Sequence, residues 1–214
     1  MKKLLSIFLL SSILAVCVLG FSSCAKLDTT GLLEEAPSLI ERSSMLNEVF
    51  FGVGIPYNKD STPVGNYYEA DKDYLREAGF STVDQLKAIT RKVFSEEYST
   101  IIFETNLSGF AVEGGGYTYA RYTSSQAEAL RDDKETILVF VGEGNQNPYE
   151  IGACTYDYST LSLEKVGRDY AEVTLSVHTV FSPSTVYPEG YEETAPMTIR
   201  FVYEDGWRID SPTY

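Results

Sequence analysis

The sequence contains one histidine, His178, and a single cysteine downstream of its first 24 residues, Cys154. A thiol next to an imidazole can act as a nucleophile, because the imidazole removes the thiol proton. Neither residue sits in a recognisable catalytic signature, and a lone cysteine commonly behaves as a small buried apolar side chain. His178 falls on the polar side of an alternating stretch, where a structural role is common. We therefore predict that the chain carries no catalytic residue.

Carboxylates are numerous and fall mainly in predicted turns. Paired acids can carry out acid–base chemistry or bind calcium, but the spacing of a calcium-binding loop is missing from the sequence. One histidine and one free cysteine are too few for a zinc site. We expect no metal and no cofactor, and we interpret most of the acids as a solvated surface, including Asp132, Asp133, Glu204 and Asp205.

Two predicted loops have compositions that suit recognition. Residues 142–150 are polar and glycine-rich, and residues 182–196 mix tyrosines and acids with three prolines that limit the freedom of the loop. Tyrosines provide contact area at a low entropic cost. The alternative is a long connection without a role. The predicted partner-binding residues are Glu143, Tyr149, Tyr187, Glu189, Tyr191, Glu192 and Glu193.

The balance of charge restricts the class of partner. The chain has 31 acidic and 17 basic residues and a formal net charge of −14. Nucleic acids and anionic lipids are polyanions, so neither is an expected ligand. A cationic partner or simple solubility fits the charge. The hydrophobic share of 43% is enough for one core, and we expect that core to hold the domain together without a disulfide.

The N-terminus has the form of an export signal. Lys2 and Lys3 precede an apolar run over residues 4–19, which Gly20 ends. Spanning a bilayer takes about 20 apolar residues, and this run is shorter, so a signal peptide is the better interpretation than a transmembrane helix.

Residues 21–24, Phe-Ser-Ser-Cys, resemble the lipobox of bacterial lipoproteins. Ser22 and Ser23 fit that pattern, whereas Phe21 replaces the usual aliphatic residue. The resemblance implies a signal peptide over residues 1–23, a lipid anchor on Cys24, a tether over residues 24–34, and a position on the outer face of the cytoplasmic membrane of a bacterium. Secretion without an anchor is the alternative.

Helical signals occupy the first half of the remaining chain. Ser38 and Glu41 form a capping box, and Leu39, Leu46, Val49, Phe50 and Val53 follow at helical spacing. Ser81 and Thr82 predict the start of a second helix. Ser95 predicts the start of a third, which buries Tyr98, Ile101 and Ile102.

Strand signals occupy the second half. We expect strands over residues 117–122, 137–141, 160–166, 169–181 and 197–203, and a last strand from residue 207 after a tight hairpin at Asp205 and Gly206. Helices followed by antiparallel strands indicate the α+β class. Residues 35–214 would then form a single domain, with N-terminal helices packed on one face of a curved antiparallel sheet.

Residues 201–209, Phe-Val-Tyr-Glu-Asp-Gly-Trp-Arg-Ile, resemble the final hairpin of the cystatin-like or nuclear-transport-factor-like superfamily. Within it, residues 94–98 and 207–214 are similar to segments of the IseA family of D,L-endopeptidase inhibitors. This resemblance implies a non-catalytic domain that blocks a cell-wall hydrolase of the cysteine–histidine type, or meets another envelope protein. The alternative function is a cup-shaped domain that binds a small molecule or is weakly enzymatic.

Overall fold

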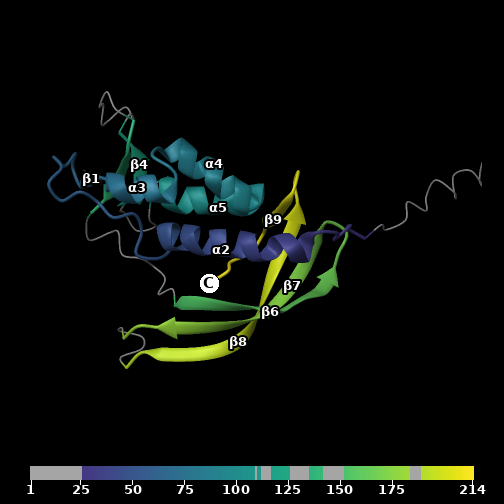
Figure 1. Cartoon of the computed structure of the whole chain (residues 1–214). Helices are drawn as coiled ribbons and strands as arrows, with labels where there is room; N and C mark the ends of the chain where they lie inside the picture. The colour runs from purple at the N-terminus through teal and green to yellow at the C-terminus, as the bar shows by residue number, and fades with distance from the viewer. Residues whose placement is uncertain (1–25, 109, 112–116, 126–134, 142–151, 184–188) are drawn as a thin grey trace, which may run out of the picture.

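The computed structural model describes residues 26–108, 110–111, 117–125, 135–141, 152–183 and 189–214. The prediction of an α+β domain with an N-terminal helix packed on a curved antiparallel sheet is confirmed. The sheet contains β6 (Ala153–Val166), β7 (Tyr170–Phe181), β8 (Tyr191–Tyr203) and β9 (Trp207–Ile209), in the order β6-β7-β8-β9. The long helix α2 (Leu32–Phe50) lies along its concave face (Figure 1).

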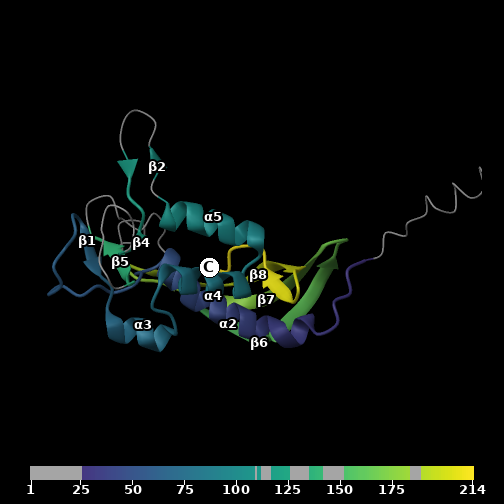
Figure 2. The ribbon, with the colours of Figure 1, turned by 90° about the horizontal axis from the view of Figure 1, so that it is seen from above.

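The remaining helices lie on the far side of α2 from the strands β6 to β8. They are α3 (Lys72–Ala78), α4 (Val83–Val93) and α5 (Glu96–Leu107). Helices α2, α4 and α5 run side by side above the sheet, and α3 lies at the end of this layer where α2 finishes (Figure 2). None of the helices in the described ranges has both the length and the apolar character needed to cross a bilayer.

Two small antiparallel sheets complete the described structure. One contains β1 (Tyr67–Glu69), β5 (Ile137–Phe140) and β4 (Tyr122–Ser124), with β5 in the centre, and the other pairs β2 (Phe110–Ala111) with β3 (Tyr117–Thr118). Arg121, directly before β4, and Tyr122, the first residue of β4, lie at the end of α2. Arg121 donates to the carbonyls of Phe50 and Gly52 at 2.8 and 2.6 Å, which caps the helix.

Tyr122 secures the same helix end from within the core. Its hydroxyl donates to the carbonyl of Val49 at 2.6 Å and accepts the amide N–H of Ile55 at 3.0 Å. Burial raises the pKa of Tyr122 to about 12, so the hydroxyl keeps its proton and its donor role.

Local capping determines where the shorter helices begin, as the sequence predicts. The Thr82 hydroxyl accepts the amide N–H of Gln85 at 3.2 Å, and the Ser95 hydroxyl accepts that of Tyr98 at 3.0 Å. Helix α3 did not stand out in the sequence, although Asp71 caps it and Gly79, at φ 79°, ends it. On α5, the prediction that Ile101 is buried is wrong: this side chain is exposed, whereas Ile102 is buried.

Helix α2 begins seven residues earlier than the capping box at Ser38 predicts. It starts at Leu32 after Gly31, and Pro37 lies inside it. Leu32 and Ala36 are fully buried, so packing on the sheet extends the helix toward its N-terminus, and Glu34 and Glu35 favour the positive helix end. Val53, expected on the buried face, lies beyond the helix and is 91% exposed.

The sheet alternates as expected where α2 covers it. Ala171, Val173, Leu175 and Val177 of β7 are buried beneath the helix, and their neighbours face outward. Two predicted boundaries are wrong: β6 begins at Ala153 instead of residue 160, and β8 begins at Tyr191 instead of residue 197. Residues 191–196 are therefore strand, paired with β7 from Phe181 to Ser176, and not loop.

The segment around Ser95 joins the helical layer to the sheet. The amide N–H of Ser95 donates to the carbonyl of Ile209 at 2.8 Å, and its hydroxyl donates to the carboxylate of Asp210. The amide N–H of Glu96 donates to Glu204 at 3.0 Å. The segments 94–98 and 207–214, which carry the resemblance to the IseA family, thus form one contact in the fold.

We predict that Ser95→Ala lowers the free energy of unfolding by about 1–2 kcal/mol, because it removes both the cap of α5 and the contact with Asp210. Urea unfolding followed by circular dichroism measures the change. Thr105→Ala on the same helix is the control, since its hydroxyl bonds only within the helix, to Ile101; its effect should stay within about 0.5 kcal/mol. Equal losses in both variants would refute the role of Ser95.

Candidate functional site

Cys154 and His178 lie on opposite faces of the sheet. The pairing register places Cys154 opposite Thr179 and His178 opposite Thr155. Cys154 faces the concave side, where its thiol contacts the hydroxyl of Thr179 at 3.6 Å and the carbonyl of Gly152 at 3.5 Å. His178 faces the convex side, where its Nδ1 contacts the hydroxyl of Thr194 at 3.0 Å. The two side chains therefore do not form a nucleophile–base pair.

The predicted partner-binding residues fall into two groups. Glu143, Tyr149 and Tyr187 lie outside the described residues, as does the predicted anchor Cys24. Glu189, Tyr191, Glu192 and Glu193 are described, and they lie together where β7 turns into β8. We call this end of the sheet the sheet tip and define it as residues 153–158, 176–183 and 189–196.

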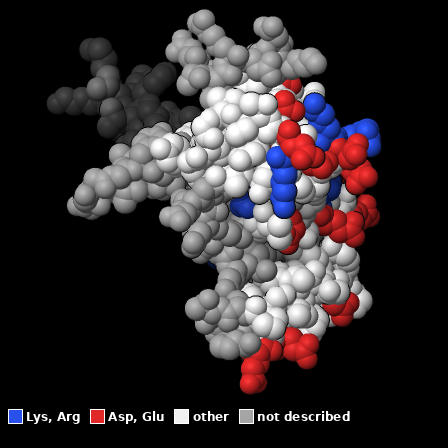
Figure 3. Space-filling model, turned by 90° about the vertical axis from the view of Figure 1, so that its left-hand side faces the viewer, with Lys and Arg blue, Asp and Glu red and all other residues white. Residues whose placement is uncertain are grey.

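The sheet tip is acidic and carries no lysine or arginine in its three described ranges. Its charged residues are Asp157, Glu189, Glu192 and Glu193, together with the titratable His178. Figure 3 shows the corresponding lower end of the molecule with acidic atoms and without basic ones on the face in view. A surface of this kind attracts cations and repels anions.

The tip residues divide between the two faces of the sheet. Tyr191 and Glu193 pair with Phe181 and Thr179, and so they share the concave face with Cys154. Glu192 pairs with Val180 on the convex face, where its carboxylate lies 3.9 Å from Nε2 of His178. A partner that binds the tip can therefore contact acids from both sides.

Two aromatic rings support the concave side of the tip. The rings of Phe181 and Tyr191 are 6.2 Å apart, and the Tyr191 hydroxyl donates to Glu193 at 3.0 Å. Tyr191 is 44% exposed and Val180, on the other face, is 40% exposed. The tip thus offers apolar contact area beside its carboxylates, held in place by strand pairing.

Two cations at the opposite end of the sheet, Lys165 and Arg200, make contacts within the chain. Lys165 and Arg200 both lie over the ring of Tyr170, at 5.1 and 4.4 Å from its centroid. Lys165 also pairs with Glu172 at 3.5 Å, and Arg200 pairs with Asp210 at 3.2 Å. Lysine and arginine therefore occur together with acids near the β6–β7 turn, whereas the described tip carries acids alone.

A small cavity of about 160 Å³ opens on the concave face between α2 and β6. Its lining comprises Ser44, Asn47, Glu48, Gly152, Ala153, Cys154, Tyr156 and Tyr214. The cavity was not predicted, although Ser44, Asn47 and Glu48 give a signal in the sequence: they form a polar patch at helical spacing beside the apolar positions of α2. Burial raises the pKa of Tyr156, whose hydroxyl donates to the carbonyl of Thr213 at 2.8 Å.

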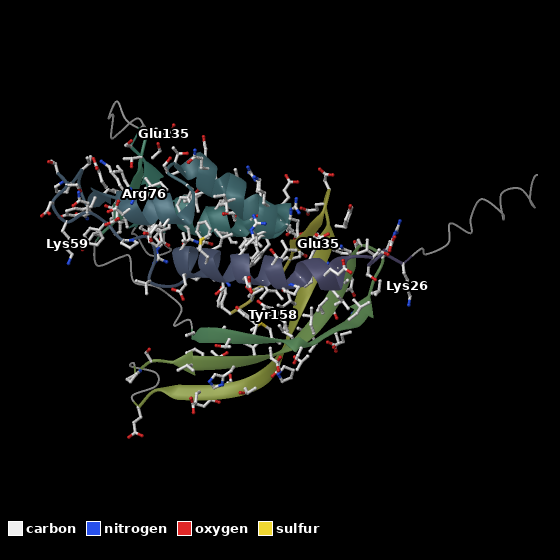
Figure 4. The ribbon with its side chains drawn as sticks, viewed as in Figure 1. Lys26, Glu35, Lys59, Arg76, Glu135 and Tyr158 are labelled. Carbon is white, nitrogen blue, oxygen red and sulfur yellow. The ribbon has the colours of Figure 1, made fainter. Side chains whose placement is uncertain are left out.

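Tyr158 lies beside this cavity, between α2 and the sheet (Figure 4). Its ring stacks on that of Tyr156 with centroids 6.1 Å apart. Burial, followed by the nearby Glu41 carboxylate, raises the pKa of Tyr158, so both tyrosines stay neutral at physiological pH. Glu48 is thus the one charged side chain among the described residues that line the cavity.

A larger cleft, of about 460 Å³, lies beside α3, and Arg76 and Glu135 are among its lining residues (Figure 4). Its polar groups contact one another or their neighbours: Lys72 pairs with Glu69 at 3.3 Å, Arg76 pairs with Asp73 at 2.8 Å, and Gln85 accepts the hydroxyl of Ser81. Across the described ranges, no three His, Cys, Asp or Glu side chains gather as metal ligands would.

We predict that alkylation of Cys154 by iodoacetamide does not depend on His178, because the two side chains face opposite sides of the sheet. In residues 26–214, where Cys154 is the sole cysteine, His178→Asn should leave the rate unchanged within about twofold. An imidazole that activates the thiol would make the same substitution slow the reaction about tenfold or more. Mass spectrometry of the quenched reaction measures the rate.

The chain matches no model of a known protein family, and neither the curated proteins nor the solved structures contain a significant match. The resemblance to the IseA family therefore remains a prediction that rests on residues 94–98 and 207–214.

Proposed function

We propose that this protein is a membrane-tethered, extracytoplasmic and non-catalytic binding domain whose sheet tip binds and inhibits a cell-wall D,L-endopeptidase. The observation that carries the proposal is the composition of the tip: acids and exposed tyrosine on paired strands, with no lysine or arginine in its described ranges. The expected partner surface is basic and lies at the mouth of the enzyme's cleft.

Strand pairing supports the tip as a recognition element. Because β7 and β8 pair as far as Phe181 and Tyr191, the backbone at the tip is ordered before a partner arrives. A preordered surface loses less conformational entropy on binding than a flexible loop does. The carboxylates would speed association with a basic partner, and the aromatic side chains would supply the buried contact area.

The position of the proposed anchor agrees with this use of the tip. The amide N–H of Leu27 donates to the carbonyl of Gly167 at 3.2 Å, so the chain is docked on the β6–β7 turn three residues after Cys24. Lys26 lies at this end of the molecule (Figure 4). The tip lies at the other end of β7, roughly 35 Å away for a strand of 12 residues. A lipid on Cys24 would hold the turn near the membrane and direct the tip away from it.

The anchor gives the first test. In a bacterial host that processes lipoproteins, we expect the full chain to sediment with the membranes, and the N-terminal peptide to carry lipid on Cys24. Cys24→Ser should release the protein into the soluble extracytoplasmic fraction or leave its signal peptide uncleaved, whereas Cys17→Ser should change neither. Membrane association of Cys24→Ser with a cleaved signal peptide would exclude the lipid anchor.

The second test concerns the tip. Residues 26–214 should slow hydrolysis of peptidoglycan by a cysteine-type D,L-endopeptidase, and added salt should weaken the effect. Replacing Glu189, Glu192 and Glu193 by glutamine should raise the inhibitory concentration about tenfold or more, because it removes the charges that attract the enzyme.

The matched control replaces three exposed helical acids, Glu41, Glu77 and Glu104, by glutamine, which gives the same net charge. Its inhibitory concentration should stay within about twofold of the parent protein. Absence of inhibition across representative endopeptidases would refute the proposed function. Equal losses in both triple variants would show that overall charge, and not the tip, is responsible.

A further inference from the structure

Asn47 is the only described residue whose buried side-chain oxygen lines the cavity between α2 and β6 without a hydrogen-bond donor. The side chain is 3% exposed, and no donor among the described residues reaches its Oδ1 atom. An unpaired buried acceptor costs about 1–3 kcal/mol. Such an atom beside a cavity can accept a hydrogen bond from a donor group that enters it.

The amide of Asn47 is oriented with its nitrogen toward Thr213. The Ser43 hydroxyl donates to the carbonyl of Ile40 at 2.7 Å and lies 2.7 Å from the hydroxyl of Thr213, a contact in which either oxygen can be the donor. The Thr213 oxygen accepts from Nδ2 of Asn47, also at 2.7 Å. This chain commits Nδ2 to Thr213, which does not line the cavity, and leaves Oδ1 as the atom of the amide available to a ligand.

The other cavity walls restrict the charge of that ligand. Among the described lining residues, Glu48 at the exposed rim is the one charged side chain, and none of them is a lysine or an arginine. Ser44 and Cys154 add a hydroxyl and a thiol. An anionic ligand would therefore meet a like charge at Glu48 and an acceptor at Oδ1 of Asn47, whereas a cation would be attracted by Glu48.

The volume of the cavity limits the size of the ligand. A cavity of about 160 Å³ is close to the size that accommodates benzene, or about five water molecules. A ligand, or the part of it that enters, therefore has roughly five to seven heavy atoms.

We propose that this cavity binds a small primary ammonium compound, whose N–H groups donate to Oδ1 of Asn47 while its charge is balanced by Glu48. The proposal does not depend on the function of the sheet tip, since none of the tip acids lines the cavity. The test below likewise requires no endopeptidase.

The test is a titration of residues 26–214, labelled with ¹⁵N, by n-butylammonium chloride at constant ionic strength. The hydrophobic core of the described residues lies between Leu27 and Tyr214, so this fragment keeps all of that core. The side-chain amide signal of Asn47 and the backbone signals of Cys154 and Tyr156 should shift together, with a dissociation constant on the order of millimolar for so small a ligand.

Two further probes separate donation from charge. Tetramethylammonium has the charge without an N–H donor, and 1-butanol has a donor without the charge. Both should bind about tenfold or more weakly than n-butylammonium. Equal shifts from tetramethylammonium, or no saturable shift from n-butylammonium, would overturn the proposal.

Two variants distinguish ligation from a structural role of Asn47. Asn47→Leu removes Oδ1 and should abolish binding. Thr213→Val removes the same hydrogen bond to Nδ2 but keeps Oδ1, and should bind within about threefold of the parent protein. Equal loss in both, with native-like spectra, would show that Asn47 acts only through the packing of the C-terminal segment. Glu48→Gln should weaken n-butylammonium binding and leave 1-butanol binding unchanged.

Discussion

Three buried side chains, Ser43, Asn47 and Thr213, join helix α2 to the segment that follows the last strand. Their hydrogen bonds are all 2.7 Å long and shielded from water. Bonds of this kind are costly to break, because the groups left unpaired stay buried. They hold Thr213 where its carbonyl meets Tyr156, and they bring Tyr214 against the ring of Phe51 at 5.1 Å. A polar contact therefore links α2, the final segment and β6, and it leaves a cavity at their junction.

The charged side chains of the sheet differ in whether they pair with groups of the same chain. Near the β6–β7 turn, Lys165 and Arg200 both lie over the ring of Tyr170 and pair with carboxylates of the same chain. At the sheet tip, the described residues offer no lysine or arginine to pair with Glu192 or Glu193. The acids of the tip therefore have no lysine or arginine of the described tip beside them, and β7 connects this end of the sheet to the end where the chain enters the domain.

Sequence patterns predict those parts of the fold that local contacts determine. The caps at Thr82 and Ser95 involve residues three apart, and the buried face of β7 alternates because α2 covers it. The start of β8 could not be predicted because residues 191–196 lie beyond the helices and none of them is buried. Strand β9 pairs only with residues 201–203, which leaves this part of β8 at an edge of the sheet. Pro196 can therefore occupy a strand position there. The composition of residues 189–193 is enough to predict an acidic surface at the tip. The role of Asn47 cannot be predicted from local sequence, since its partner Thr213 lies 166 residues away.

The tip and the cavity share the concave face, since Thr179 pairs with Cys154 on one side and with Glu193 on the other. Their physical bases nevertheless differ. The tip relies on exposed carboxylates, whose attraction is screened over about 10 Å at 0.1 M salt. Oδ1 of Asn47 acts at hydrogen-bond distance in a buried setting, where salt has little effect. Ionic strength should therefore weaken recognition at the tip much more than hydrogen bonding in the cavity, so two neighbouring surfaces that both favour cations can differ in their response to salt.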